Sequence, residues 1–391
     1  MDDRLFTRPF AYTWVATFGS LLALGMLLPV LPVYARGPLD VGNLGVGIAV
    51  AAGSPTALLL QPIAGRLGDR RGRRPLVVVG CLVLALSIAL YVPASSLVAI
   101  VALRLVGGVG EALLFVGTAT VVNDIAPPAR RGEAVSLYSL AVWGGLAAGP
   151  VLGELVLRDD SFDTVWLVAA GAAVVAALAA LRLPETRPAD QPVHVGRQPY
   201  VHPAALAPGL VLVLSMIGFA GMAAFAPLYA RELGLSGAGP VFALNAVIVI
   251  AIRSVGRRIP DRFGPRRTAT VAMALAATGF AVIAIADSPA GLYAGTAVLG
   301  CGQALVFPAL MMVVVARAPA AQRSSAVGSF TAAADVGYAI GAISLGAVAG
   351  AAGYRAVFVV AALVVAAGLA PLARVRPAPG VATPAAVDAP P

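Results

Sequence analysis

The sequence predicts an all-α membrane protein with twelve transmembrane helices in two pseudo-symmetric six-helix bundles. The first reason is composition: of 391 residues, 60% are hydrophobic and only 12% are charged, unlike a soluble globular protein. The second is that the apolar residues gather in runs of about 20, the length of helix that crosses about 30 Å of hydrocarbon. The third is that one arginine-rich connection between such runs occurs twice, which indicates an internal repeat.

Twelve runs have roughly this length. They cover residues 11-34, 43-64, 76-93, 97-122, 134-156, 163-183, 205-229, 240-258, 268-286, 290-314, 325-350 and 354-373. The third and fourth runs are separated only by Pro93 to Ser96, so turn chemistry alone sets that boundary. The residues before the first run are charged and include no evident small-residue cleavage site. We therefore expect a retained helix and not a cleaved signal peptide.

The placement of arginine predicts the orientation. With the N-terminus in the cytoplasm, the inner connections and tails hold 21 of the 27 arginines and the outer connections hold four, as the positive-inside rule requires. The other two, Arg104 and Arg253, lie within spans. We expect a multi-pass protein of the cell (inner) membrane with both termini in the cytoplasm. The net charge of +9 falls in the connections, so it does not indicate nucleic-acid binding.

The two halves of the chain are related at a constant offset of 192 residues. The matches include Asp69 with Asp261, Gly108 with Gly300, Gly110 with Gly302, Phe115 with Phe307, Arg131 with Arg323 and Gly149 with Gly341. We predict an N-terminal bundle over 1-183, a cytoplasmic linker over 184-204, a C-terminal bundle over 205-373 and a disordered tail over 374-391. Repeats of the same orientation tend to hold a ligand where the halves meet, near the bilayer midplane.

The first arginine-rich connection runs from Gly65 to Pro75. It contains five arginines, one aspartate and three glycines, so it cannot enter lipid and must be a tight turn in water. Gly65 and Gly72 are expected to permit the turn, and Asp69 to accept hydrogen bonds or meet the positive N-terminus of a helix. The predicted gating residues of this connection and of its weaker copy at 256-267 are Gly65, Asp69, Arg70, Gly72, Arg73, Arg74, Asp261, Arg262 and Gly264.

These patterns together resemble the major facilitator superfamily, from the first span to about residue 373. They are the twelve spans, the doubled connection GxLxDRxGRR, the fourth-span sequence RLVGGVGEA and the fifth-span sequence GLAAGPVLGE. The resemblance implies that the connection is a cytoplasmic latch between the halves, which holds when the transporter opens outward. The alternative is that its arginines only enforce topology, although topology alone would not need Asp69 and the glycines. The second copy departs from the pattern, with Arg257 in place of the first glycine.

The fifth-span pattern is similar to that of the superfamily's proton-driven efflux antiporters. Its residues are Gly145, Gly149, Pro150 and Gly153. The glycines form a strip on which another helix can approach closely, and Pro150 removes one backbone hydrogen bond and bends the span. Small residues also serve ordinary packing. Where the family usually has a second terminal glycine this chain has Glu154, which either disturbs the helix contact or lies near the outer surface without effect.

Two charged residues of the fourth span are candidates for proton coupling. Arg104 lies seven residues into the span, where a charge is costly unless it faces a cavity or a partner. Glu111 follows two helical turns later, on nearly the same face. The resemblance implies a role in proton coupling for Arg104, and a movement that changes its separation from Glu111 would change the proton affinity of the pair. The alternative is that Glu111 is a fixed structural counterion.

The second half has its own acid within a span, Asp335, whose repeat partner is Trp143. Asp335 is a proton site, a binding group for a cationic substrate, or the group that neutralises Arg253. Polar or aromatic side chains within spans are candidate cavity residues, although each equally suits a helix-to-helix hydrogen bond. They are Gln61, Tyr138, Trp143, Asn245, Gln303 and Tyr338.

These observations predict a secondary transporter: a proton-coupled exporter of small organic molecules, drug-like or sugar-like, in which two halves rock around a central cavity. We expect a monomer whose partners are its substrate, protons and the lipid bilayer, with no cofactor, metal or catalytic residue. Proton-coupled uptake is the alternative within transport. A membrane-embedded enzyme is disfavoured because the two histidines, His194 and His202, lie in a connection and no HExxH or GxSxG pattern occurs. A receptor leaves the charges within spans unexplained.

Overall fold

The computed structural model describes residues 6–127, 130–157, 161–187, 202–256, 259–319 and 322–374. Every regular element in these ranges is a helix, which confirms the predicted all-α class. The helices are α1 (Arg8–Arg36), α2 (Asn43–Ala51), α3 (Gly53–Arg71), α4 (Arg73–Ala89), α5 (Leu97–Ile125), α6 (Arg131–Val156), α7 (Phe162–Leu181), α8 (Pro203–Glu232), α9 (Gly239–Val255), α10 (Ile259–Phe263), α11 (Pro265–Ala286), α12 (Pro289–Arg317), α13 (Arg323–Ala367) and α14 (Leu369–Arg374). Most of the predicted linker and tail lies outside the described residues.

Nine helical segments of the described chain are long and apolar enough to cross a membrane. One of them, Asn43–Arg71, comprises α2 and α3, because the residue between them, Ala52, is itself helical. Another contains α13, in which two predicted spans meet at Gly353, where a φ of +80° breaks the helix. The helices α4 and α9 are shorter, at 17 residues each. With these two added and α13 counted as two arms, the spans equal the predicted twelve.

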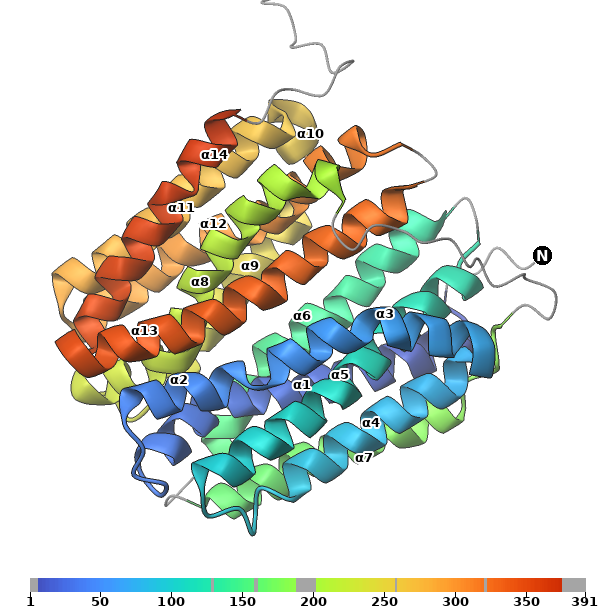
Figure 1. Ribbon diagram of the computed structural model, residues 1–391, viewed down its shortest axis with the longest axis horizontal. Helices are drawn as coiled ribbons and strands as arrows, with labels where there is room; N and C mark the ends of the chain where they lie inside the picture. Colours follow the sequence, from blue (N-terminus) through green and yellow to red (C-terminus); the bar gives the residue numbers. More distant parts are fainter. Residues whose placement is uncertain are drawn as a thin grey trace, which may run out of the picture.

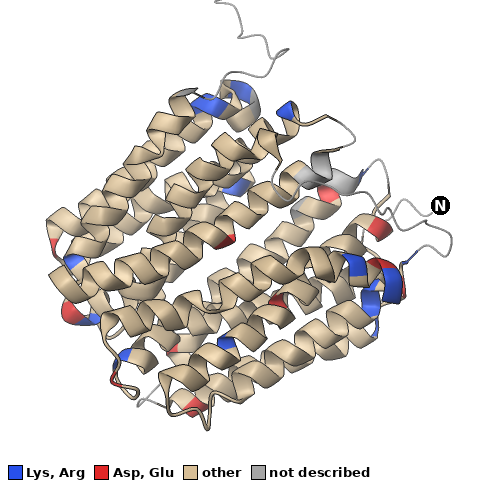
Figure 2. Cartoon of the chain, viewed as in Figure 1, with Lys and Arg blue, Asp and Glu red and all other residues tan. Residues whose placement is uncertain are grey.

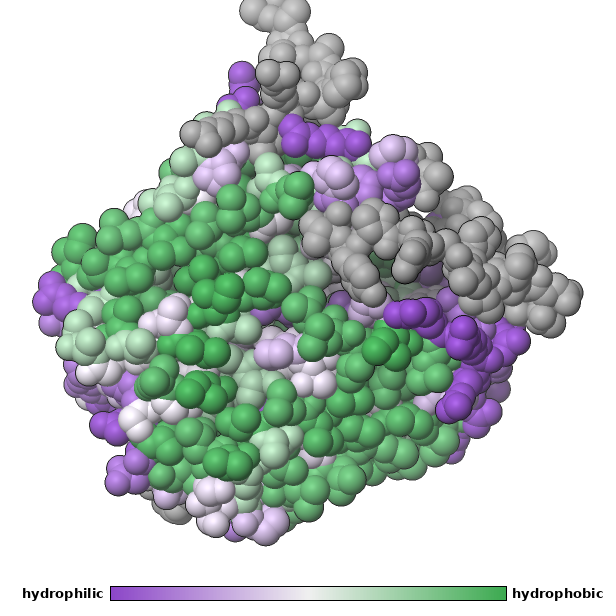
Figure 3. All heavy atoms as spheres, viewed as in Figure 1, coloured by the Kyte–Doolittle hydropathy of each residue, from purple (hydrophilic) through white to green (hydrophobic). Residues whose placement is uncertain are grey.

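The surface of the molecule has the polarity of a membrane protein. Most charged residues lie toward two opposite ends of the chain (Figure 2), and a broad hydrophobic belt lies between these ends on the face shown in Figure 3. Large apolar side chains of the belt are exposed, including Leu178 at 57% and Leu363 at 65%. Such exposure would be unfavourable in water but suits contact with lipid. We call the end that carries the Gly65–Pro75 connection the arginine-rich end.

The buried apolar residues form two large clusters: one lies wholly in the second half, and the other fills the first half and continues into α8 and α13 of the second. Figure 1 shows how the helices of the two halves are arranged. In the first half, the Trp166 ring lies 5.5 Å from that of Tyr34 and 5.3 Å from that of Tyr91, joining α7 to α1 and to the end of α4. In the second half, Tyr229 of α8 packs on Phe358 of α13 at 5.2 Å. Buried aromatic pairs of this kind stabilise a bundle through both apolar area and ring geometry.

The halves meet along three pairs of neighbouring helices. The span α2–α3 contacts α13, α6 contacts α9, and α1 contacts α8. The closest approach is at the end opposite the arginine-rich end, where a Cβ on Gly47 of α2 would collide with the backbone of Ala342 in α13. The Asn43 side chain, at the start of α2, donates to the Ala349 carbonyl (3.0 Å) and accepts from the Tyr354 hydroxyl (3.2 Å). Backbone packing and hydrogen bonds therefore join the halves at this end.

Candidate functional site

A hydrogen bond between the two halves forms the centre of the candidate site. Gln61 of α3 donates through Nε2 to Oδ2 of Asp335 in α13, at 3.2 Å. Both side chains are half-buried and lie within the apolar part of their helices. The structure thus places a predicted cavity residue directly against a predicted proton-coupling residue, although they are 274 positions apart in the chain.

Glu111 of α5 belongs to the same cluster. It is half-buried and interacts electrostatically with two groups of the opposite half, Asp335 and Tyr338. It also interacts with Arg104 of its own helix, although no ion pair within 4.0 Å joins these two described residues. Glu111 therefore interacts electrostatically with both of the other predicted proton-coupling residues, Arg104 of its own half and Asp335 of the opposite half.

Arg104 is held by the backbone of the neighbouring span. Its Nη2 donates to the carbonyl oxygen of Val50 at 3.3 Å, while its Nε is fully buried without a hydrogen-bond partner in the described chain. Gly53 leaves room for the guanidinium, because a Cβ there would lie 3.0 Å from Nη2. Gly108 allows α5 to cross α3 closely, since a Cβ there would collide with the Gly53 carbonyl. Gly108, the glycine of the fourth-span sequence that allows this close crossing, thus helps to position Arg104.

If both carboxyl groups are ionised, Arg104, Glu111 and Asp335 together carry one more negative charge than positive. Uptake of one proton makes this cluster neutral. Because unbalanced charge is costly in the membrane interior, the cluster is suited to bind and release one proton as its hydration changes. Interacting acids titrate together, so a proton bound here would belong to the pair and not to either residue alone.

A second contact between the halves involves Arg253 of α9 and Trp143 of α6. The guanidinium Cζ lies 4.1 Å from the centroid of the indole ring, a cation–π arrangement, and Nε donates to the Ala304 carbonyl at 3.2 Å. No ion pair joins Arg253 to Asp335 in the described chain. Asp335 is instead hydrogen-bonded to Gln61, so the structure does not show it neutralising Arg253.

The remaining predicted cavity residues lie in different settings. Tyr338 is half-buried beside Phe219, with ring centroids 6.1 Å apart. Tyr138 is buried and hydrogen-bonded to Thr118 of the same half at 3.1 Å, so it joins α6 to α5. Asn245 donates to Gln303 at 3.2 Å and joins α9 to α12. Asn245 and Gln303 thus form a helix-to-helix contact within the second half, and Tyr138 forms one within the first half.

The arginine-rich connection is held together within the first half. Arg73 pairs with Asp69 at 3.0 Å and with Asp124 of α5 at 3.2 Å. Glu185, after α7, accepts from the backbone N–H groups of Arg73 (2.8 Å) and Arg74 (3.2 Å). Partial burial raises the pKa of Glu185, but these and two neighbouring N–H donors outweigh it and hold its pKa below the ordinary value.

The turn of each connection is made at one glycine. Gly72 has a φ of +104° and Gly264, its repeat partner, a φ of +82°, and each precedes the next helix. Such angles favour glycine. The expectation that Gly65 also permits the turn is wrong, because Gly65 lies inside α3 with helical backbone. Arg262 lies beside Phe263, with Cζ 5.5 Å from the ring centroid, and the Asp261 side chain lies outside the described residues.

The glycines of the fifth-span pattern pack α6 against α1. A Cβ on Gly149 would lie 2.5 Å from the backbone of Gly25, and one on Gly145 or Gly153 would lie 2.7 Å from a carbonyl oxygen of α1. Pro150 lies inside the same helix. The strip therefore serves contact within the first half, where it fixes the distance between two helix backbones.

Sequence reasoning missed the role of Glu154. Its carboxylate accepts hydrogen bonds from the backbone N–H groups of Ala238 (2.6 Å) and Gly239, at the start of α9 in the other half. Gly237 and Gly239 allow this approach, because a Cβ on either would collide with the carboxylate. A negative charge at a helix N-terminus is stabilised by the free N–H groups and by the helix dipole. Glu154 therefore joins the halves at the end opposite the arginine-rich end.

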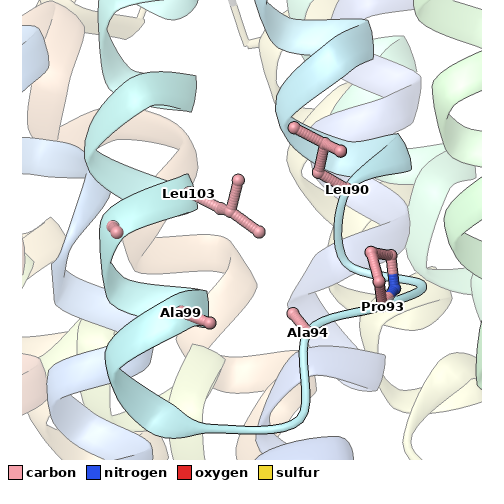
Figure 4. Close-up of a pocket in the computed structure, with 6 residues that line it drawn as sticks. Leu90, Pro93, Ala94, Ala99 and Leu103 are labelled. Atoms are coloured by element: carbon pink, nitrogen blue, oxygen red, sulfur yellow. The ribbon is translucent and has the colours of Figure 1, made fainter.

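A separate shallow pocket of about 350 Å³ lies where α4 ends and α5 begins (Figure 4). It is lined by Leu90, Pro93, Ala94, Ala99, Ala102 and Leu103. None of these side chains carries a polar group, and none belongs to the charged cluster. The pocket therefore offers no group that would fix the orientation of a polar ligand.

The sequence and the fold were compared with known proteins. A family model described as Major Facilitator Superfamily matches residues 13–290 and 255–391. The "Uncharacterized MFS-type transporter STM4428" of Salmonella typhimurium is 31% identical over 357 residues, covering 89% of this chain and 91% of the relative. A similarly named protein of Burkholderia pseudomallei, BURPS1106A_3201, is 32% identical over 368 residues, covering 90% and 88%.

Solved structures share the fold at low sequence identity. The human organic anion transporter MFSD10 has a TM-score of 0.70 at 22% identity, covering 95% of this chain and all of that one. The nucleoside transporter NupG has a TM-score of 0.75 at 14% identity, covering 94% and 99%. The matches to the family model, to the sequence relatives and to the solved structures all extend along nearly the whole chain. The chain belongs to the major facilitator superfamily and is a multi-pass membrane transporter.

Proposed function

We propose that this protein is a proton-coupled secondary transporter that exports small organic molecules by alternating access. The observation that carries the proposal is that Asp335 is hydrogen-bonded across the halves to Gln61 and interacts electrostatically with Glu111, an acid of the opposite half that also interacts with Arg104. A relative movement of the halves changes the separation and hydration of these groups, and hence the proton affinity of the cluster. Proton uptake and conformation are thereby linked, as coupled transport requires.

The Gln61–Asp335 bond supports the same proposal. The bond exists only while the halves are close at this depth, so separation of the halves exchanges the Gln61 amide for water as the partner of Asp335. The two conformations therefore present the acid with different surroundings. A ligand, including a proton, shifts a conformational equilibrium only to the extent that it binds the two states differently.

We further propose that the arginine-rich connection is a cytoplasmic latch. Asp69 is paired with Arg73, but 53% of its side chain remains exposed, so it can accept a further hydrogen bond. The neighbouring Arg70 and Arg74 side chains are exposed as well. When the arginine-rich ends of the halves approach, these groups would join them, and the present pairing would hold the connection in shape while the ends are apart. This proposal also takes both termini to be cytoplasmic and the protein to be a monomer.

The direction of transport is proposed from the fifth-span glycine and proline pattern, which is similar to that of efflux antiporters. Its place against α1 supports a rigid first half but is compatible with either direction. The test is transport by purified protein in liposomes, over a panel of small organic substrates with an imposed pH gradient. Export predicts that substrate moves against the proton flow; movement with the protons would instead establish uptake. Ligand binding without any movement would favour a receptor.

A further inference from the structure

Arg253 is a charged side chain placed between the halves without an acidic partner. In the described chain no carboxylate lies within 4.0 Å of its guanidinium, and no acid contributes electrostatically to its ionisation. Arg104, the other arginine within a span, has Glu111 nearby. Asp335, the acid that lies within a span of the same half, is bonded to Gln61. An arginine in the membrane interior is costly unless something compensates its charge.

The Arg253 side chain is held in place from two sides. The Trp143 ring covers one face of the guanidinium, and Nε is occupied by the carbonyl of Ala304. A guanidinium has five N–H donors, so four remain on the two terminal nitrogens. None of the Arg253 nitrogens is fully buried without a partner, in contrast to Nε of Arg104. The terminal nitrogens form no hydrogen bond in the described chain and are not fully buried, so they are oriented by the contacts of the rest of the side chain and remain accessible to a ligand.

We infer that Arg253 and Trp143 form an anion-binding subsite, and that the transported molecules are small organic anions bearing a carboxylate or phosphate group. The planar guanidinium offers two parallel N–H donors, which suit bidentate binding of either group, and the fixed orientation reduces the ordering cost of binding. The anion would supply the negative charge that Arg253 lacks. This inference rests on the proposed transport function and narrows its substrate class.

The position of the subsite favours a mobile ligand over a structural ion. Arg253 belongs to the second half and Trp143 to the first, so separation of the halves would remove the indole from the guanidinium. Cation–π contact contributes on the order of 0.5–2 kcal/mol, depending on desolvation. Bound anion and indole therefore both stabilise Arg253, and the anion's affinity depends on whether the halves are together.

The test is ligand-dependent thermal unfolding of the purified full-length protein, with pairs of compounds that differ in charge. The probes are benzoate with benzamide, phenyl phosphate with phenol, and inorganic phosphate, each at millimolar concentration. A ligand that binds only the native state raises the unfolding midpoint. We expect the anionic member of at least one organic pair to raise it and the neutral member to leave it unchanged. Equal effects of both members, or no effect of any anion, would overturn the inference.

Three variants test whether the shift in the unfolding midpoint arises from anion binding at Arg253. Arg253→Gln should abolish the shift, and Arg253→Lys, which keeps the charge without the planar fork, should retain only part of it. Arg182→Gln, which changes an exposed arginine just after α7, is the matched control and should keep the full shift. If Arg253→Gln does not fold, tryptophan emission provides a second readout: a change on adding the anion should be present in the parent and absent in Trp143→Phe. A full shift in Arg253→Lys together with an unchanged emission response in Trp143→Phe would contradict the subsite.

This experiment separates the inference from the proposed function, because it requires neither transport nor a pH gradient. Anion binding lost in Arg253→Gln, without transport of those anions in liposomes, would keep the subsite and remove the transport proposal. Proton-coupled transport of neutral molecules, unaffected by Arg253→Gln, would keep the transport proposal and remove the subsite.

Discussion

Gln61 and Asp335 form a hydrogen bond between the two halves, and the internal repeat reproduces their positions in a second pair. At the offset of 192 residues, Gln61 corresponds to Arg253 and Asp335 corresponds to Trp143, and these two residues also contact each other between the halves. In each pair the ionisable group belongs to the second half and a neutral side chain of the first half covers it. Separation of the halves at this depth would thus expose the Asp335 carboxyl group and the Arg253 guanidinium together.

The repeat also shows why charge is concentrated in one cluster. The positions equivalent to Gly53, Arg104 and Glu111 hold Asn245, Thr296 and Gln303. There the Asn245–Gln303 bond replaces the charged pair, and the Thr296 hydroxyl is buried without a partner in the described chain. The backbone arrangement is thus shared, but only the α3–α5 side carries an arginine and a glutamate at these positions.

Glu154→Gln should shift the protein away from the conformation described here. The substitution removes a charge from the start of α9, which contributes about 1 kcal/mol, or roughly a fivefold change in the population ratio. Distances between spin labels on α6 and α9, at the end opposite the arginine-rich end, should lengthen. Glu232→Gln, which neutralises an exposed acid at the C-terminal end of α8, is the matched control and should leave the distances unchanged. Identical distance distributions in Glu154→Gln and the parent would refute this role.

Gly149→Ala should destabilise the first half. The added Cβ would lie 2.5 Å from the backbone of Gly25, so α1 and α6 must move apart, at a cost of about 1–3 kcal/mol. Thermal unfolding in detergent should show a lower midpoint. Gly171→Ala provides the control: no atom lies within 4 Å of the added Cβ, and its helix propensity favours alanine. A midpoint for Gly149→Ala equal to that of Gly171→Ala would contradict the packing assigned to the strip.

Asp69→Asn should slow the transport cycle with expression and folding intact. The Arg73 side chain keeps Asp124 as a partner, so the connection retains its shape, but the charge proposed to join the arginine-rich ends is lost. Initial rates of substrate transport in liposomes provide the measurement. Asp163→Asn, at the start of α7 near the other end of the molecule, is the control. Parental rates in the Asp69 variant would remove the latch proposal.

Glu185 should make the arginine-rich end sensitive to acid. Its pKa in the folded protein lies below its unfolded value of about 4.3, so its ionised form stabilises the fold above that pH. The contribution is lost as pH falls through the lower, folded-state pKa. The unfolding midpoint of Glu185→Gln should therefore lie below the parent's at pH 7, and the difference should shrink below about pH 4. A difference independent of pH would show that the carboxylate charge is not what stabilises the connection.

The sequence was sufficient for the spans, because membrane crossing requires long apolar runs. The sequence did not predict the contact that Glu154 makes with the other half. Its partners are backbone N–H groups 84 and 85 positions away, and such groups are present in almost every residue, so no particular side chain identifies them. The turn glycine was predictable at Gly72 but not excluded at Gly65, since only backbone angles separate a helical glycine from a turn glycine.

Partners between the halves depend on how two bundles dock, which no local pattern encodes. The repeat offset nevertheless identifies equivalent positions, so knowledge of the Gln61–Asp335 contact would have suggested the one between Arg253 and Trp143. The sequence placed Asp335 and Arg253 in one half and left open whether they neutralise each other; docking gives each a different partner from the other half.

The most direct test of the central claim is transport by Glu111→Gln in liposomes with an imposed pH gradient. The amide keeps the size of the side chain but cannot exchange a proton, so the cluster no longer gains and loses charge. The account predicts that substrate still equilibrates down its own gradient, while accumulation driven by the pH gradient is lost; Glu232→Gln should behave like the parent. Gradient-driven accumulation at the parental level in Glu111→Gln would contradict the account.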